Sequence, residues 1–373
     1  MRTDNDTRIS PYESDLLNVL RGLAIIGVVA MHSIQVTDSL NVTHTSAFVS
    51  QVLYLGKYGV EVFFFLSGWL LTALYGLNQN RLPKSYAARR FARIFPLWTL
   101  FLCIYLAQSF IMNSGGFYDA LNSKTNVGLT SRTEVIILLT LTFTLFISSE
   151  LWNTVIPGGW SIQSEVAHYF LFPFIRQRGI KTILLVTASI NFFSTGLLLL
   201  QSKTDQVSSL IAPFLSTWLR LGLYSTFSFF LFGILAQRIY SHRKHGDQND
   251  SWWEGKEFGL FILSSFCINC PVGVQIEAIG YLCINVLLAI SLVHFDSIRR
   301  GLIQIGNYSY FIYFVHFLIL KLMYWQFKKY FFENQLYVFA ILFLATMFCS
   351  TMIAIPSRKY LEIPILQRVR QKG

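Results

Sequence analysis

Long apolar runs, separated by short polar and basic segments, recur from one end of this chain to the other. A run of about 18 or more apolar residues is long enough to cross a bilayer as a helix. The pattern predicts an all-α integral membrane protein built as a bundle of about ten transmembrane helices, and it excludes a soluble domain with a single anchor. We expect these helices at residues 19–38, 57–77, 92–112, 159–175, 181–200, 222–240, 257–272, 278–295, 302–325 and 335–356.

One apolar stretch, residues 134–148, does not fit this division. It is short and rich in threonine, and counting it as a span would turn Arg176, Arg178 and Lys181 outward. We interpret it as a re-entrant segment or one that lies beside the bundle, which is allowed where protein or water satisfies its backbone. The alternative is eleven spans with the carboxyl terminus outside.

Composition and charge agree with a membrane protein. The chain is 53% hydrophobic and only 13% charged, against about 25% charged residues in soluble domains. Most of its 30 lysines and arginines lie in short segments beside apolar runs that alternate along the chain. This is the positive-inside pattern, and it places both termini in the cytoplasm. No basic stripe interleaved with aromatic residues is seen, so the net charge of +11 does not indicate a nucleic-acid partner.

The organisation along the chain is simple. We find no cleavable signal peptide, no internal repeat and no room for an appended soluble domain, so we expect residues 1–373 to form one membrane-embedded domain. The five cysteines lie in or beside apolar runs, and the spacing of Cys267 and Cys270 lacks the two further ligands that a zinc site needs. We therefore expect no metal.

Arg21 and His32 are the two ionisable side chains within the first apolar run. Charged groups are costly in hydrocarbon, so they usually face a protein interior or a water-filled cavity and mark a substrate path. Eleven residues bring a helix back to within about 20° of its starting direction, and they advance it by about 16 Å. The spacing predicts that both side chains share one face of the helix, with a reactant between them.

Five short motifs occur in order along the chain. They are Leu20-Arg21-Gly22-Leu23-Ala24 running to His32, Gly59 to Gly68 with Glu61, Tyr86 to Pro96 with Arg90 and Arg93, Trp160-Ser161 with Glu165, Tyr169 and Phe172-Pro173, and Ile305 to His316 with Tyr310 and Tyr313, followed by Glu362-Ile363-Pro364. Together they resemble the bacterial acyltransferase type 3 family of integral-membrane O-acyltransferases, which includes the O-antigen, exopolysaccharide and nodulation-factor O-acetylases. The resemblance covers about residues 15–368. The family often has Asp where Glu61 stands, and a second acidic residue where this chain has Val166.

Acyl transfer from a thioester to a hydroxyl needs a base, stabilisation of an oxyanion and a grip on the donor. His32 suits the base, since imidazole titrates near neutral pH, or it could accept the acyl group as a nucleophile. Arg21, Arg90 and Arg93 would hold the phosphates of coenzyme A through their guanidinium groups. The alternative for these arginines is that they extend to the inner headgroups and set the topology.

The remaining candidate residues have both a functional and a structural interpretation. Glu165 would orient His32 or the acceptor, whereas Glu61 stands near a helix start, where the helix dipole favours an acid. Trp160 would anchor at the outer interface or contact sugar, and Ser161 would hydrogen-bond within the site. We expect Tyr310 to serve helix packing, with His316 a second candidate for acceptor contact.

The resemblance implies an enzyme that transfers an acyl group, in the first place acetyl, from cytoplasmic acyl-coenzyme A to a carbohydrate hydroxyl. Acyl-coenzyme A would be a co-substrate, with no permanently bound cofactor. The acceptor would be a surface polysaccharide or lipid-linked glycan, and the protein would lie among the lipids of the bacterial inner membrane. A small amphiphile such as a macrolide is the alternative acceptor, and succinyl the alternative group. A glycan or lipid transporter, or an inactive scaffold in polysaccharide assembly, are alternatives from other classes.

Overall fold

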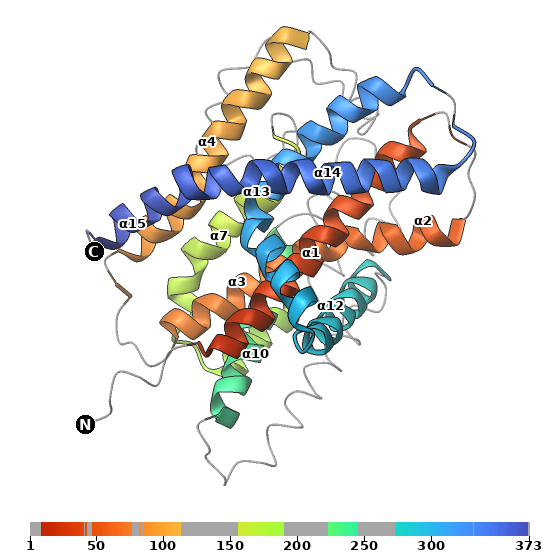
Figure 1. Cartoon of the computed structure of the whole chain (residues 1–373). Coiled ribbons are helices and arrows are strands. Elements are labelled where there is room, and N and C mark those ends of the chain that lie inside the picture. Colours follow the sequence, from red (N-terminus) through yellow and green to blue (C-terminus); the bar gives the residue numbers. More distant parts are fainter. Residues whose placement is uncertain are drawn as a thin grey trace, which may run out of the picture. The chain divides into compact units, whose positions relative to one another are not determined.

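Helices make up almost all of the regular structure in the computed structural model of this chain (Figure 1). The structure describes residues 9–40, 42, 47–76, 82–83, 85–112, 156–189, 223–244, 273–330 and 332–371. Within these ranges the one β contact is an isolated parallel bridge between Val42 and Phe332. The prediction of an all-α fold is confirmed.

Several helices are long and apolar enough to cross a bilayer. In the described part of the chain there are five, Pro11–Asp38, Phe48–Tyr75, Tyr86–Gln108, Asp296–Phe327 and Gln335–Val369. They overlap the predicted spans 19–38, 57–77, 92–112, 302–325 and 335–356, and the shorter apolar helices Ile180–Ser189 and Glu277–Leu292 overlap two more. The chain is therefore a multi-pass membrane protein with the architecture of a helix bundle.

The predicted segments 134–148 and 257–272, and residues 190–200 of the predicted span 181–200, lie outside the described residues. The choice between ten and eleven spans, and the assignment of residues 1–373 to one domain, therefore remain predictions.

The labelled elements are α1 (Pro11–Asp38), α2 (Ala47–Tyr54), η1 (Leu55–Tyr58), α3 (Gly59–Tyr75), α4 (Tyr86–Met112), α7 (Gly159–Ile175), α10 (Leu223–Lys244), α12 (Gly273–Leu292), α13 (Asp296–Phe327), α14 (Gln335–Ser357), η3 (Arg358–Glu362) and α15 (Ile363–Gln371).

Helix α1 begins at Pro11, eight residues before the start that the apolar run predicted. The Ser10 N–H donates to Glu13 Oε2 (2.8 Å), and the Glu13 N–H donates to Ser10 Oγ (3.2 Å). This reciprocal pair is a capping box, and proline is favoured as the first residue inside a helix. The helix therefore starts in polar sequence, and its apolar part is only the membrane-spanning portion.

The carboxyl-terminal helices also run further than predicted. Asn334 caps α14, its side-chain oxygen accepting the Tyr337 N–H at 3.1 Å. After Ser357 the chain continues through the π-helical turn η3 into α15, which ends at Gln371. Pro356 lacks the N–H of a normal helical hydrogen bond, and the wider turn that follows keeps the chain helical past it.

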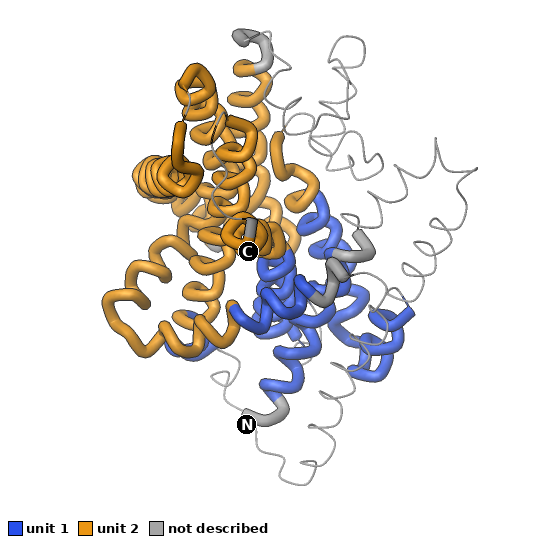
Figure 2. The backbone as a smooth tube through the Cα atoms, turned by 90° about the vertical axis from the view of Figure 1, so that its right-hand side faces the viewer, with its two compact units in different colours: residues 1–14, 61–82, 163–284 blue, residues 15–60, 83–162, 285–373 orange. Residues whose placement is uncertain are grey.

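The chain divides into two compact units, which Figure 2 distinguishes by colour. Several helices, among them α1, α3 and α7, contribute residues to both units. Unit 1 comprises Met1–Ser14, Glu61–Leu82 and Gln163–Ile284, and unit 2 comprises Asp15–Val60, Pro83–Ile162 and Asn285–Gly373.

In unit 2, α1 and α13 cross at very short range. A Cβ on Gly306 would lie 2.0 Å from Asn18 O, and one on Gly22 would lie 2.5 Å from Leu302 O. Small residues at such a crossing let two backbones approach closely, which is typical of helix pairs in membranes. The two glycines therefore fix how the helices carrying His32 and His316 meet.

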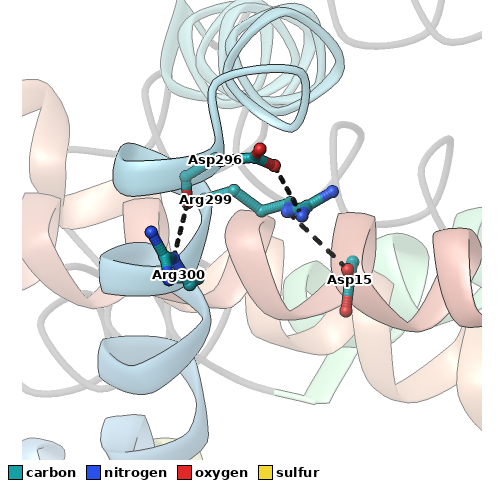
Figure 3. A network of polar contacts seen from close by, with 4 residues as sticks. All are labelled: Asp15, Asp296, Arg299 and Arg300. Atoms are coloured by element: carbon teal, nitrogen blue, oxygen red, sulfur yellow. Dashed lines mark hydrogen bonds and ion pairs between the residues drawn. The ribbon is translucent and has the colours of Figure 1, made fainter.

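Charged residues reinforce the crossing at the start of α13 (Figure 3). Arg299 pairs with Asp296 on its own helix at 2.7 Å and with Asp15 of α1 at 3.9 Å. The Arg300 Nε–H donates to Asp296 O at 3.3 Å. Arg299 thus links the first turn of α13 to α1.

A second close contact in unit 2 joins α1 to the segment around η1. A Cβ on Gly56 would lie 2.0 Å from Gly27 O. At the carboxyl end of α1, Asp38 accepts hydrogen bonds from the Tyr54 hydroxyl (2.9 Å) and the Gln335 side-chain amide (2.6 Å). Asp38 therefore joins α1 to α2 and α14.

In unit 1 the close pair is α3 with α10. A Cβ on Gly233 would lie 1.9 Å from Phe65 O, and one on Gly68 would lie 2.0 Å from Phe230 O. His168 of α7 stacks on Phe230, with ring centroids 4.8 Å apart, and lies 3.2 Å from the Thr226 hydroxyl. These contacts hold α3, α7 and α10 together.

Two buried arginines close the carboxyl ends of α7 and α3. Arg238 donates to the Arg176 carbonyl at 2.7 Å, and Arg176 donates to the Tyr75 carbonyl at 3.1 Å. Cationic donors at a helix carboxyl end satisfy its free carbonyls and suit its dipole. These two residues therefore have a structural function in addition to the topological one that their charge predicts.

Candidate functional site

Arg21 and His32 both lie on α1, as the spacing predicted, and both belong to unit 2. The Arg21 guanidinium donates to Asn18 Oδ1 at 3.2 Å, one helical turn earlier. His32 Nδ1 and Gln35 Oε1 are 2.9 Å apart. Because an amide oxygen can only accept, Nδ1 is the protonated nitrogen of neutral His32. The other ring nitrogen, Nε2, then keeps a lone pair that can act as a base or a nucleophile.

His32 meets a second histidine from α13. The ring centroids of His32 and His316 are 5.3 Å apart, and Phe317 lies 4.4 Å from His32 and 4.1 Å from His316. His316 Nδ1 donates to Ile312 O at 3.0 Å, and its ring is fully buried. Its Nε2 has no hydrogen-bond partner in the part of the chain that the structure describes. Leaving a buried polar atom unpaired costs about 1–3 kcal/mol, so this nitrogen is suited to a partner that arrives with the substrate.

The amino-terminal end of α7 lies beside these histidines. Ser161 and Tyr313 hydroxyls are 2.7 Å apart, and they lie 2.9 Å and 3.0 Å from Gly158 O. Two hydroxyl protons cannot serve three contacts at once, so one contact is always left open. The Tyr313 ring lies 5.8 Å from that of His316. Tyr313 therefore connects Ser161 to His316, through its hydroxyl group on one side and its ring on the other.

Gly158 explains how the backbone fits there. Its φ is +70°, a left-handed conformation that glycine adopts without strain. A Cβ at this position would lie 2.7 Å from the Tyr313 hydroxyl oxygen and 3.1 Å from the Phe317 ring. The absence of a side chain therefore allows the start of α7 to lie against α13.

Trp160 and Tyr310 flank this cluster in the sequence. Trp160 is in the first turn of α7 and is partly exposed, which suits the predicted interfacial or substrate contact. The Tyr310 ring packs edge-on against Phe314, with centroids 5.2 Å apart. This contact lies within α13 and does not place Tyr310 against His32.

The arginines of α4 meet the end of the chain instead. Arg90 lies with its guanidinium carbon 6.0 Å from the centre of the Tyr86 ring. Arg93 and Arg358 both lie close enough to the Glu362 carboxylate to attract it. Arg358 also donates to Asn307 Oδ1 at 3.3 Å. The third motif and the end of the fifth are thereby brought together in unit 2.

The two acidic candidates, Glu165 and Glu61, belong to unit 1, whereas His32 and His316 belong to unit 2. Glu165 Oε1 accepts hydrogen bonds from the hydroxyls of Ser67 (3.2 Å) and Tyr169. Glu61 lies in the first turn of α3, where the helix dipole favours an acid. The structure gives Glu165 two hydroxyl donors, which is a defined role within unit 1, and its predicted support of His32 remains a prediction.

Sequence reasoning missed Gln35 and Gly158, included Glu362 in a motif without giving it a role, and gave Tyr313 only a packing role. Gln35 lies three residues after His32, within reach on one helix face, so its side chain could have been noticed. The others depend on contacts between distant segments. Among the described residues no group of three or more His, Cys, Asp or Glu side chains gathers as a metal site would need.

Comparisons with known proteins give one positive result. No curated protein and no solved structure matches the chain. The profile of the acyltransferase 3 family, described as an acyltransferase domain, matches residues 15–355. This range includes every candidate residue named above except those after α14. The chain belongs to the acyltransferase 3 family, and it is a membrane-bound acyltransferase.

Proposed function

We propose that this protein transfers an acetyl group from cytoplasmic acetyl-coenzyme A to a hydroxyl of a surface polysaccharide or lipid-linked glycan in the bacterial inner membrane. The observation that supports this best is the arrangement on α1, where Arg21 and the base-like Nε2 of His32 share one helix. Their separation of about 16 Å along the axis is comparable to the reach of a pantetheine arm. The phosphates could stay at the membrane surface while the thioester reaches His32.

His32 serves this reaction in one of two ways. As a general base, its Nε2 accepts the proton of the acceptor hydroxyl while the oxygen attacks the thioester carbon. As an acyl carrier, the same nitrogen attacks the thioester first and passes the acyl group on. Both routes need the lone pair on Nε2, and the hydrogen bond from Nδ1 to Gln35 provides it.

Three arginines hold the donor in this proposal. Arg21, Arg90 and Arg93 bind the phosphates of coenzyme A, because the guanidinium fork matches phosphate oxygens. Glu362 near Arg93 offsets part of that positive charge when the donor is absent. The family implies that an acyl donor is used, and these three arginines are the reason for choosing one that carries phosphates.

The other candidates support the acceptor side. Glu165 positions His32 or the acceptor through its carboxylate, and Trp160 and Ser161 contact the carbohydrate at the start of α7. Glu61 and Tyr310 have supporting roles within their own helices. The carbohydrate hydroxyl is proposed because carbohydrates are the commonest acceptors in the family. Both termini are proposed to lie in the cytoplasm, because the basic residues favour that orientation.

The test uses the full chain in nanodiscs with radiolabelled acetyl-coenzyme A. Wild type is compared with His32→Ala, Arg21→Ala and, as a matched control, His294→Ala, which removes an exposed histidine in the turn before α13. We expect slow loss of label from the donor in wild type and the control. His32→Ala lowers this rate by about 10²–10⁴-fold, while Arg21→Ala raises the KM for the donor by about 10-fold or more.

Three outcomes have clear meanings. Wild-type rates in His32→Ala would remove His32 from the chemistry. Turnover of succinyl- but not acetyl-coenzyme A would change the acyl group while keeping the mechanism. Absence of turnover, together with no thermal stabilisation by coenzyme A, would show that the donor is of another class.

A further inference from the structure

We propose that His316 is the base that accepts the proton of the acceptor hydroxyl, so that this hydroxyl binds between the imidazoles of α1 and α13. The proposal rests on the proposed function, moves the role of general base from His32 to His316, and gives the acceptor a location. His32 is then the acyl carrier or, in direct transfer, the group that positions the acceptor hydroxyl. The proposal gives His316 a chemical role in place of a general contact with the acceptor.

Both imidazoles have one nitrogen committed as a donor. His32 Nδ1 donates to Gln35 Oε1 at 2.9 Å, and His316 Nδ1 donates to Ile312 O at 3.0 Å. Each neutral ring therefore has only an acceptor nitrogen left, Nε2. Two acceptors cannot hydrogen-bond to each other, although the ring centroids are only 5.3 Å apart. The pair needs a molecule that supplies an O–H or N–H.

The burial of His316 makes that need stronger. Its ring is 0% exposed, and Nε2 has no partner within the described ranges. His32 is partly exposed, so the more open side of the pair is on α1. A substrate that enters along His32 would present its hydroxyl to a nitrogen shielded from water. Such shielding raises the strength of a hydrogen bond and lowers competition from solvent.

The surroundings favour a neutral alcohol. Phe317 packs on both imidazoles, at 4.4 Å and 4.1 Å between ring centroids. On the side of α7, Gly158 presents no side chain toward Phe317 and Tyr313. An alcohol group can enter such a site at a lower desolvation cost than an ammonium group. The chemical class of acceptor is therefore a hydroxyl compound.

The chemical step is balanced in either route. The acceptor O–H bond breaks and its proton moves to His316 Nε2, while the oxygen forms the new ester bond to the acyl carbon. In direct transfer the thioester C–S bond breaks, and the sulfur takes the proton from His316 and leaves as the thiol of coenzyme A. If His32 carries the acyl group, its Nε2 first forms the acyl C–N bond as the thioester C–S bond breaks and coenzyme A leaves as the thiolate. The acceptor oxygen then forms the ester bond as the C–N bond breaks, which returns neutral His32, and the proton taken up by His316 passes to the thiolate to give the thiol.

The experiment measures acetyl transfer to octyl glucoside, a hydroxyl-rich amphiphile used as a probe, and to water, in the full chain in nanodiscs. His316→Phe keeps an aromatic ring in the core but removes the base. We expect its rate to fall by about 10²–10⁴-fold with both acceptors, while coenzyme A still raises its melting temperature as it does for wild type. His168→Phe is the matched control, since it removes another fully buried histidine, in unit 1, and should retain the wild-type rate.

Chemical rescue separates a base from a structural ring. In His316→Gly, added imidazole should restore turnover by 10-fold or more, whereas 1,2,4-triazole, which is similar in shape but much less basic, should not. Equal rescue by the two compounds, or a wild-type rate in His316→Phe, would overturn the assignment. A wild type that turns over neither probe would instead overturn the proposed function, and with it this inference.

Discussion

The hydrogen bond between His32 and Gln35 determines which ring nitrogen is available for chemistry. Gln35 Oε1 accepts from Nδ1 at 2.9 Å, so neutral His32 presents Nε2 as its lone pair. Without this acceptor the ring would populate both tautomers. The partner of one ring nitrogen sets which of the two nitrogens carries the proton.

We therefore predict that Gln35→Leu lowers kcat for acetyl transfer by about 10-fold, equivalent to about 1.4 kcal/mol, and leaves the KM for acetyl-coenzyme A unchanged. Gln35→Glu, which keeps an acceptor oxygen, should retain most of the activity. Gln371→Leu, an exposed position near the end of the chain, serves as the control. Steady-state kinetics in nanodiscs measure these effects, and equal losses in the Leu and Glu variants would contradict this role.

At the scale of single residues, the sequence could predict the relative positions of side chains that lie on the same helix. Eleven-residue spacing placed Arg21 and His32 on one face, and the structure has both on α1. It could not place His316 beside His32, because helical periodicity gives the face of a residue but not the helix that it meets. For the same reason it could not separate Tyr313, which contacts Ser161, from Tyr310, which packs on its own helix.

At the scale of helices, the crossing of α1 and α13 determines whether the two histidines meet. The crossing depends on two glycines, since a Cβ at 306 would lie 2.0 Å from the Asn18 carbonyl oxygen. The apolar runs predicted both helices well but not that they touch. Of the helix boundaries, the start of α1 could have been found from Ser10 and Glu13, whereas the continuation past Pro356 depends on local backbone geometry.

We predict that Gly306→Ala destabilises the protein by about 1–3 kcal/mol through overpacking and reduces acetyl transfer with it. The matched control is Gly301→Ala on the same helix, where a Cβ would have no atom within 4 Å. Alanine there should leave stability unchanged or raise it by about 1 kcal/mol, because alanine favours helix over glycine. Thermal unfolding of both variants in one detergent tests the difference in sign, and a tolerated Gly306→Ala would show that the helices can separate freely.

The contact between α4 and η3 offers a way to separate the two roles of Arg93. If Arg93 served only to pair with Glu362, exchanging the two residues should restore everything that the single variants lose. We predict instead that the double variant Arg93→Glu with Glu362→Arg recovers part of the thermal stability, because the new arginine then faces Arg358, but keeps a KM for acetyl-coenzyme A that is about 10-fold higher or more. Recovery of the wild-type KM together with stability would assign Arg93 to the electrostatic contact with Glu362 alone.

At the scale of the whole molecule, the charges at the ends of α13 and α14 predict the orientation. Arg299 and Arg300 precede most of α13, and Arg358, Lys359 and later basic residues follow α14, whereas Lys328 and Lys329 lie between the two helices. Because the side with more lysine and arginine stays in the cytoplasm, the hairpin should have its turn outside and both ends inside.

Reporter fusions test this orientation and the number of spans together. Alkaline phosphatase, which is active only outside, should be active when inserted at Glu333 and inactive after Gln371, and a cytoplasmic fluorescent reporter should give the opposite result. The eleven-span alternative predicts the reverse at both positions, because an additional crossing at residues 134–148 would invert every later helix. Arg21, Arg90 and Arg93 precede residues 134–148, so the proposed donor residues stay on the cytoplasmic side in both topologies. A reversed result would place Arg358 and Glu362 on the opposite side of the membrane from Arg93, although Glu362 lies close enough to Arg93 to be attracted by it. That contact is therefore the structural reason to expect the turn outside and both ends of the hairpin inside.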